Sequence, residues 1–211
     1  MTVYYKATTV QGTDFRTGTV LYEVGQTVTH PCARRVRDDP STYLSVSTVP
    51  TDCTGMAWPC RLFEVRGIGR PLRASNLPNK RCFSALEVLA ELPATDALGP
   101  QGVEVAALIE RCATLTMAEA RALGATWVAT WVATWVATWD AARDAARDAR
   151  DAWDAARDAA RDAARDAARV AARSAALALV VRDLIAPEAF EFLFGPWRQV
   201  IERGDFGGGD Q

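Results

Sequence analysis

The chain has 211 residues, with 24 lysines and arginines against 26 aspartates and glutamates, and a formal net charge of −2. This balance excludes the overall basic excess that nucleic-acid binding uses, and there is no acidic tail. The first residues lack the basic and apolar segments of a secretory signal, and five cysteines are an odd number for a disulfide framework. We therefore expect free thiols and a cytoplasmic protein that binds no nucleic acid.

Residues 1–93 have the composition of a small β-rich α+β domain. Short runs rich in Val, Tyr, Thr and Phe alternate with Gly, Pro and Asp-Asp-Pro segments, which is typical of strands joined by turns. The pattern predicts six strands: Val3–Thr9, Thr17–Tyr22, Thr27–His30, Tyr43–Val49, Arg61–Gly67 and Arg81–Leu92.

Residues 94–115 read as a linker followed by a short helix. After them, Thr116-Met-Ala-Glu119 has the spacing of a capping box, in which the threonine hydroxyl and the glutamate carboxylate satisfy free backbone groups of a first helical turn. The next strong stop is Pro187, which lacks an amide hydrogen. The sequence therefore predicts one very long amphipathic α-helix over residues 116–186, from about Thr116 to Ile185.

This helix consists largely of a four-residue repeat, first Ala-Thr-Trp-Val and then Ala-Ala-Arg-Asp, with two shortened units at 148–153. On a helical wheel the charged residues gather on one side and the alanines on the other. Five tryptophans lie among or beside the alanines: Trp127, Trp131, Trp135, Trp139 and Trp153. An exposed strip of this kind favours packing against another helix, most simply a second copy of the chain in a coiled-coil-like homo-oligomer. A single solvated spacer helix is the alternative.

The uncharged segment Ala122–Trp139 is close to the minimum length for crossing a bilayer. Its threonines and evenly spread tryptophans argue against a membrane span, so we expect no membrane association. Residues 187–211 predict a short helical cap that Gly195-Pro-Trp197 ends, followed by a disordered Gly-rich tail.

Metal binding has one candidate ligand set. His30, Cys32, Cys53 and Cys60 combine ligand types that suit tetrahedral zinc. Their spacing matches no common zinc module, and buried free cysteine is ordinary core material. The primary expectation is no metal and no cofactor, with zinc as the alternative.

The first ninety residues resemble the ADP-ribosyltransferase superfamily, in the style of its small rifampin-modifying members. The resemblance lies in Tyr4-Tyr-Lys-Ala-Thr8, Gly25-Gln-Thr-Val-Thr-His-Pro31, Tyr43-Leu-Ser-Val-Ser-Thr48, Arg61-Leu-Phe-Glu-Val-Arg66 and Leu86-Glu-Val-Leu-Ala-Glu91. It implies an NAD-binding enzyme, active or degenerate, with a helical spacer arm. Tyr43, Ser45 and Ser47 would belong to the strand that supports the cofactor, and Glu87 or Glu91 would be the late acid.

The whole organisation is also similar to phage and actinobacterial proteins in which a small N-terminal domain precedes low-complexity alanine-rich repeats. That similarity implies no activity. The primary functional expectation is a non-enzymatic structural or interaction protein that self-associates, or binds a partner helix, through the alanine and tryptophan face. The ADP-ribosyltransferase-like enzyme is the alternative.

Overall fold

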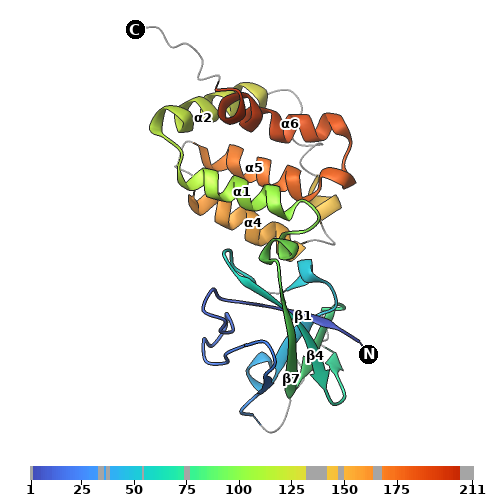
Figure 1. Cartoon of the computed structure of the whole chain (residues 1–211). Coiled ribbons are helices and arrows are strands. Elements are labelled where there is room, and N and C mark those ends of the chain that lie inside the picture. The colour runs from blue at the N-terminus through green and yellow to red at the C-terminus, as the bar shows by residue number, and fades with distance from the viewer. Residues whose placement is uncertain are drawn as a thin grey trace. The chain divides into compact units, whose positions relative to one another are not determined.

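A computed structural model describes residues 2–32, 36, 39–53, 55–73, 77–131, 142–146, 150–163 and 168–204. The protein is α+β and divides into two compact units, Met1–Gly99 and Pro100–Gln211. All described strands lie in the first unit, and all described α-helices lie in the second (Figure 1).

The first unit is built on one antiparallel sheet of seven described strands in the order β2-β7-β4-β1-β3-β6-β5. The strands are β1 Tyr4–Thr8, β2 Thr27–Thr29, β3 Leu44–Ser47, β4 Arg61–Ile68, β5 Leu72–Arg73, β6 Lys80–Phe83 and β7 Ala85–Leu92. Three short 3₁₀ turns accompany them: η1 Pro40–Thr42, η2 Pro50–Asp52 and η3 Ala94–Leu98. Five of the six expected strand regions are confirmed, with the last one divided in two.

The division at Ser84 shows how strongly the sheet curves. Only this residue separates β6 from β7, yet β4, β1 and β3 lie between those two strands in the sheet order. Because consecutive Cα atoms are about 3.8 Å apart, the two sides of the sheet must come together at Ser84. The carbonyl of Ser84 also accepts a hydrogen bond from the His30 amide at 2.8 Å, directly after β2.

An apolar core fills the curved sheet. Its buried members come from six strands and one loop: Tyr4, Tyr22, Val28, Leu44, Val46, Phe63, Val65, Phe83, Leu86 and Val88. The rings of Tyr4 and Phe83 are tilted, with centroids 5.3 Å apart, an arrangement that favours aromatic pairs. Gly67 lies so close to Phe83 that an added Cβ would be 2.2 Å from that ring. Only glycine fits at that position.

The expected strand Thr17–Tyr22 is wrong. The segment belongs to a loop that makes a single isolated β-bridge, between Thr13 and Leu21. The Asp14 carboxylate accepts hydrogen bonds from the amides of Thr17 at 2.7 Å and Val20 at 3.0 Å. A short acidic side chain that binds nearby amides in this way favours a turn over an extended strand.

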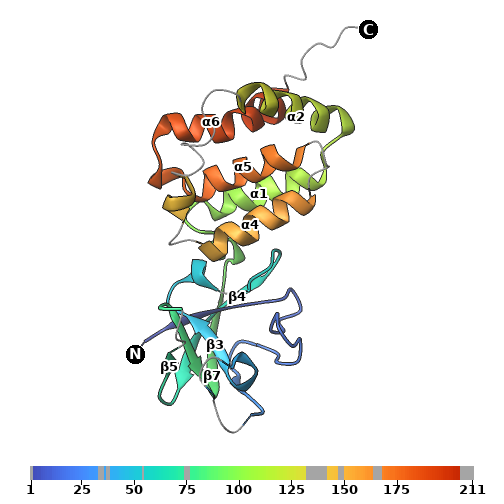
Figure 2. The same ribbon diagram turned by 180° about the vertical axis from the view of Figure 1, so that it is seen from behind.

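The second unit is a bundle of helices. The described ones are α1 Gly102–Ala113, α2 Met117–Trp131, α4 Arg150–Ala163, α5 Arg169–Val180 and α6 Pro187–Trp197, with a 3₁₀ turn η6 Arg182–Leu184 and a π-helical turn η7 Arg198–Glu202. Helix α5 contacts α1, α2, α4 and α6. It lies between the α2 and α6 pair and the α1 and α4 pair (Figures 1 and 2).

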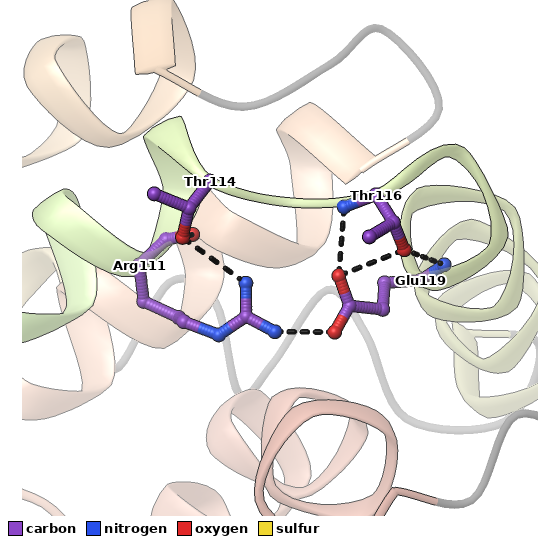
Figure 3. A network of polar contacts seen from close by, with 4 residues as sticks. All are labelled: Arg111, Thr114, Thr116 and Glu119. Carbon is purple, nitrogen blue, oxygen red and sulfur yellow. Dashed lines mark hydrogen bonds and ion pairs between the residues drawn. The ribbon is translucent and has the colours of Figure 1, made fainter.

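The predicted capping box is confirmed. The Glu119 amide donates to the Thr116 hydroxyl at 3.2 Å, and the Thr116 amide donates to the Glu119 carboxylate at 2.7 Å (Figure 3). Arg111, from the last turn of α1, forms an ion pair with the same carboxylate. The capping box therefore starts α2 and also ties it to the preceding helix.

The single long helix over residues 116–186 is wrong. Among the described residues the longest helix is α2, with 15 residues, and α4 and α5 are separate helices that pack against each other. An isolated helix gains little beyond its own hydrogen bonds, whereas shorter helices can bury their apolar sides on one another. Alanine favours this arrangement because its small side chain lets helices approach closely.

The alanine face accordingly lies inside the chain. Buried alanines include Ala142, Ala146, Ala152, Ala155, Ala156, Ala160, Ala168, Ala171, Ala172, Ala175, Ala176 and Ala178. The prediction of a coiled coil built on one long helix is therefore wrong, and the helices of a single chain form a bundle instead. One described ion pair joins charged residues of the repeat three positions apart, because Arg157 lies 3.1 Å from Asp154.

The C-terminal helix begins as predicted, with Pro187 in its first turn. It does not end at Gly195-Pro-Trp197, because α6 runs through Pro196 to Trp197 and continues into η7. Residues 205–211, where the Gly-rich tail was predicted, lie outside the described residues. Across the described part of the chain, no helix combines the length and the apolar character that crossing a membrane requires.

Candidate ligand-binding site

The first unit contains a cavity of about 420 Å³ that combines cationic and aromatic walls. Three neighbouring strands (β1, β3 and β6) and the loop between β1 and β2 supply most of the lining. Its lining residues are Lys6, Ala7, Asp14, Phe15, Arg16, Thr17, Val20, Tyr22, His30, Tyr43, Leu44, Ser45, Gly55, Leu77, Lys80 and Cys82. A cavity of this size suits a small organic ligand.

Lys6 projects from β1 beside the buried Tyr22. Its Nζ lies 5.4 Å from the centroid of the Tyr22 ring, within range of a cation–π contact. Within the described residues no hydrogen bond or ion pair to this Nζ is formed. Burial lowers the pKa of Lys6, and the charges of Cys53 and Asp14 only partly oppose this effect.

Lys80 is the second lysine of the cavity and is almost fully buried. Its Nζ donates a hydrogen bond to the Ser47 hydroxyl at 2.7 Å, and the two residues are directly paired between β6 and β3. The Ser47 hydroxyl in turn donates to the Asp52 carbonyl. Strand pairing and this chain of hydrogen bonds fix the position of the Lys80 ammonium.

The Cys53 thiol lies close enough to both lysines to interact with their charges. Burial raises the pKa of Cys53, although Lys80 and Lys6 each act in the opposite direction. Burial also raises the pKa of the neighbouring Cys60 to about 12. Both cysteines are therefore neutral thiols at physiological pH.

Asp14 is the one carboxylate among the described lining residues. It is buried, and its oxygens accept hydrogen bonds from the Thr17 amide, the Thr17 hydroxyl and the Val20 amide. Burial alone would raise the pKa of Asp14, but these hydrogen bonds and the Lys6 charge lower it. The carboxylate is thus ionised, and its hydrogen-bonding capacity is largely used by its own loop.

The aromatic part of the cavity carries polar groups as well. Tyr22 has no exposed surface, and its hydroxyl makes no hydrogen bond with any described residue. Burial raises the pKa of Tyr22 above its ordinary value, so the hydroxyl stays protonated and can donate. At another part of the wall, His30 Nδ1 accepts a hydrogen bond from the Cys32 amide at 3.0 Å.

The residues implied by the ADP-ribosyltransferase resemblance separate into two groups. Tyr43 and Ser45 line the cavity, and Ser47 holds Lys80. Glu87 and Glu91 do not line it. They form ion pairs with Arg66 and Arg61 across the β4 and β7 pairing. The cavity therefore lacks both acids that the resemblance implied, and Asp14 is held by its loop.

The structure describes only some of the other residues that the sequence predicts as site residues. No group of three or more His, Cys, Asp or Glu placed to hold a metal occurs in the described part of the chain, which includes His30, Cys32, Cys53 and Cys60. Among the tryptophans expected to bind a partner, Trp127 and Trp153 are buried within the bundle. Trp135 and Trp139 lie outside the described residues, and only the backbone of Trp131 is described.

Comparison with known proteins adds no further assignment. No protein-family model matches the sequence, and no curated protein or solved structure is significantly similar to it. The sequence interpretation missed Lys6 and Lys80 as site residues. A signal was present, because these are the two lysines of a chain that contains 22 arginines.

Proposed function

We propose that the first unit is a binding domain for a small organic anion, which occupies the cavity between β1, β3, β6 and the Asp14 loop. The main support for this proposal is the charge of the residues that line the cavity. Lys6, Arg16 and Lys80 are basic, whereas Asp14 is the one carboxylate among the described lining residues. Desolvation of Lys6 is costly for its charged form, and Asp14 already accepts hydrogen bonds from its own loop. A bound carboxylate or phosphate would supply the missing charge.

The aromatic walls favour a ligand that carries a planar or apolar part beside its anionic group. Phe15, Tyr22 and Tyr43 contribute this surface, and the Tyr22 hydroxyl offers one hydrogen-bond donor. The proposal places the protein in the cytoplasm, where its five free cysteines would remain reduced.

Pyridoxine 5′-phosphate is a suitable probe because it joins an aromatic ring to a phosphate and is small. We expect calorimetry to detect its binding to the full chain, with much weaker binding of pyridoxine, which lacks the phosphate. Lys6→Met and Lys80→Met should each weaken the interaction roughly tenfold or more, because a charge-assisted hydrogen bond contributes about 1.5–3 kcal/mol.

Arg121→Met is the matched control, since it removes an exposed cation from α2 in the second unit. This variant should bind the probe like the unchanged protein. Equal affinity for pyridoxine and its phosphate, or indifference to both lysine substitutions, would remove the basis of the proposal.

Self-association through the alanine and tryptophan face is not part of this proposal. The described alanines of that face are largely buried against other helices of the same chain. Homo-oligomerisation stays a prediction from the sequence, which light scattering can test.

A further inference from the structure

The two lysines of the chain both line the same cavity. Lysine and arginine together number 24, so the other 22 of these residues are arginines. The ion pairs of the described residues use arginine throughout, as in Arg61–Glu91 and Arg182–Glu104. Primary amines on side chains are therefore confined to one place in the molecule.

This restriction matters because the two basic side chains differ in chemistry. Arginine stays protonated in proteins and binds carboxylates and phosphates better than lysine through its planar fork of donors. A site that needed only positive charge would be served at least as well by arginine. Lysine alone can lose its proton and become a nucleophile.

Lys6 has the surroundings that such a nucleophile needs. Its Nζ lies beside the Tyr22 ring in the cavity wall, and no described residue accepts a hydrogen bond from it. Desolvation of this kind disfavours the ammonium form and increases the fraction of neutral amine. Lys80 differs, because its Nζ donates a hydrogen bond to the Ser47 hydroxyl and is held there.

We propose that Lys6 forms a reversible imine with a small anionic aldehyde or ketone bound in this cavity, an inference that rests on the anion-binding function proposed above. The neutral Nζ adds to the carbonyl carbon and forms a carbon–nitrogen bond. The two amine protons are transferred to the carbonyl oxygen, which leaves as water when the double bond to nitrogen forms. No oxidant or reductant takes part in this condensation.

The neighbouring groups can assist in distinct ways. Lys80 and Arg16 supply positive charge for the anionic group of the ligand. The buried Tyr22 hydroxyl has a proton to donate to the carbonyl oxygen as that oxygen gains negative charge. The inferred ligand class is therefore a small oxo compound that also carries a carboxylate or phosphate.

Pyridoxal 5′-phosphate tests this inference because it differs from pyridoxine 5′-phosphate by an aldehyde in place of an alcohol. The full chain is mixed with about equimolar pyridoxal 5′-phosphate and reduced with borohydride, and its peptides are mapped by mass spectrometry. We expect the reduced adduct on Lys6, about tenfold or more above Lys80 and the α-amino group of Met1. Excess pyridoxine 5′-phosphate should suppress it.

Two variants serve as controls. Arg121→Lys places an exposed primary amine on α2, so it reports ordinary lysine reactivity within the same molecule. Labelling of Lys6 should reach its maximal rate at a lower pH than labelling of that amine, because burial lowers the pKa of Lys6. Lys6→Arg removes the nucleophile, so it should form no adduct at this position, while Lys80 and the α-amino group of Met1 keep their background labelling.

The outcomes separate the two proposals. Binding of pyridoxine 5′-phosphate without an adduct on Lys6 overturns the imine and leaves anion binding in place. An adduct spread evenly over all amines, or concentrated on Lys80, also overturns it. The mapping is made on the unchanged chain, so it decides the question even if a lysine variant does not fold. Absence of probe binding removes the anion-binding proposal itself.

Discussion

Asp14 holds together the loop between β1 and β2, and its role can be separated from any ligand. Its carboxylate accepts hydrogen bonds from the Thr17 amide at 2.7 Å and the Val20 amide at 3.0 Å. The backbone of Asp14 adds two more bonds, from its amide to the Val20 carbonyl and from the Gly18 amide to its carbonyl. One residue thus sets the path of the chain along one side of the cavity.

Asp14→Asn should lower the free energy of unfolding of the first unit by about 1–2 kcal/mol at neutral pH, because a charged acceptor of two part-buried hydrogen bonds is lost. The pKa of Asp14 is lowered in the folded state. Its contribution is therefore complete above its unfolded pKa, about 4, and is lost as the pH falls through its folded pKa. Denaturation curves at neutral pH and near pH 3 measure the difference.

Glu110→Gln is the control for this experiment, since Glu110 is an exposed carboxylate on α1. It should change stability little at either pH. A gap between unchanged protein and Asp14→Asn that stays constant as the pH falls would contradict the role given to the charge.

The start of α2 is the best-defined element junction of the second unit. Glu119 accepts hydrogen bonds from the Thr116 amide at 2.7 Å and hydroxyl at 2.9 Å and pairs with Arg111 (Figure 3). The hydrogen bond from the Thr116 amide lowers the pKa of Glu119, and the Thr116 hydroxyl and Arg111 lower it further. Burial acts in the opposite direction and raises the pKa, but by less than these groups lower it. One carboxylate therefore stabilises the beginning of α2 and the turn that follows α1.

Glu119→Ala should lower the free energy of unfolding of the helical unit by about 1–2 kcal/mol, because the capping box and the ion pair are both lost. Glu110→Ala, on the exposed side of α1, should cost almost nothing because alanine is a good helix former. Chemical denaturation followed by helical circular dichroism compares the two. Equal losses would show that the junction contributes no more than an ordinary surface glutamate.

Local signals in the sequence predicted elements well where the structure depends on neighbouring residues. The capping box at Thr116 and Glu119 and the proline start of α6 are examples. The break at Ser84 could not be predicted, because residues 81–92 contain no glycine or proline that would indicate a turn. The loop of Asp14 was also missed, since a run of Thr, Val and Tyr resembles a strand.

The prediction of one long helix from the four-residue repeat was wrong for a different reason. A repeat of alanine, arginine and aspartate favours helix at every position, but it does not say where the chain reverses. Packing of α4 against α5 decides that, and it is a property of the tertiary structure. At the candidate site, resemblance led to Tyr43 and Ser45, which do line the cavity, but not to Lys6 and Lys80. Their significance emerges only when the fold brings them together.

At the scale of the whole molecule, each unit has its own core. Aromatic and branched side chains fill the curved sheet, whereas alanines such as Ala156 and Ala172 fill much of the helical bundle. Alanine cores tolerate little added volume, because the helix backbones are close together and inserted methylenes force them apart.

Ala156→Leu should therefore lower the stability of the helical unit by about 1–3 kcal/mol. Ala129→Leu, at an exposed position of α2, should stay within about 0.5 kcal/mol of the unchanged protein. In scanning calorimetry the thermal transition of the helical unit should shift alone, and probe binding to the first unit should persist. A solvated single helix would accept leucine at both positions, so equal tolerance would contradict the bundle.

The confinement of lysine to two strands of one sheet has a practical consequence for following the protein in solution. A protease that cleaves only after lysine has two possible sites in the chain, Lys6 in β1 and Lys80 in β6. Neither bond can enter a protease until its strand leaves the sheet, so cutting reports the opening of that sheet and ignores the helices. A protease that cleaves after arginine has sites in both units. Comparing cleavage by the two proteases therefore distinguishes local unfolding of the sheet from local unfolding of the helices without any label.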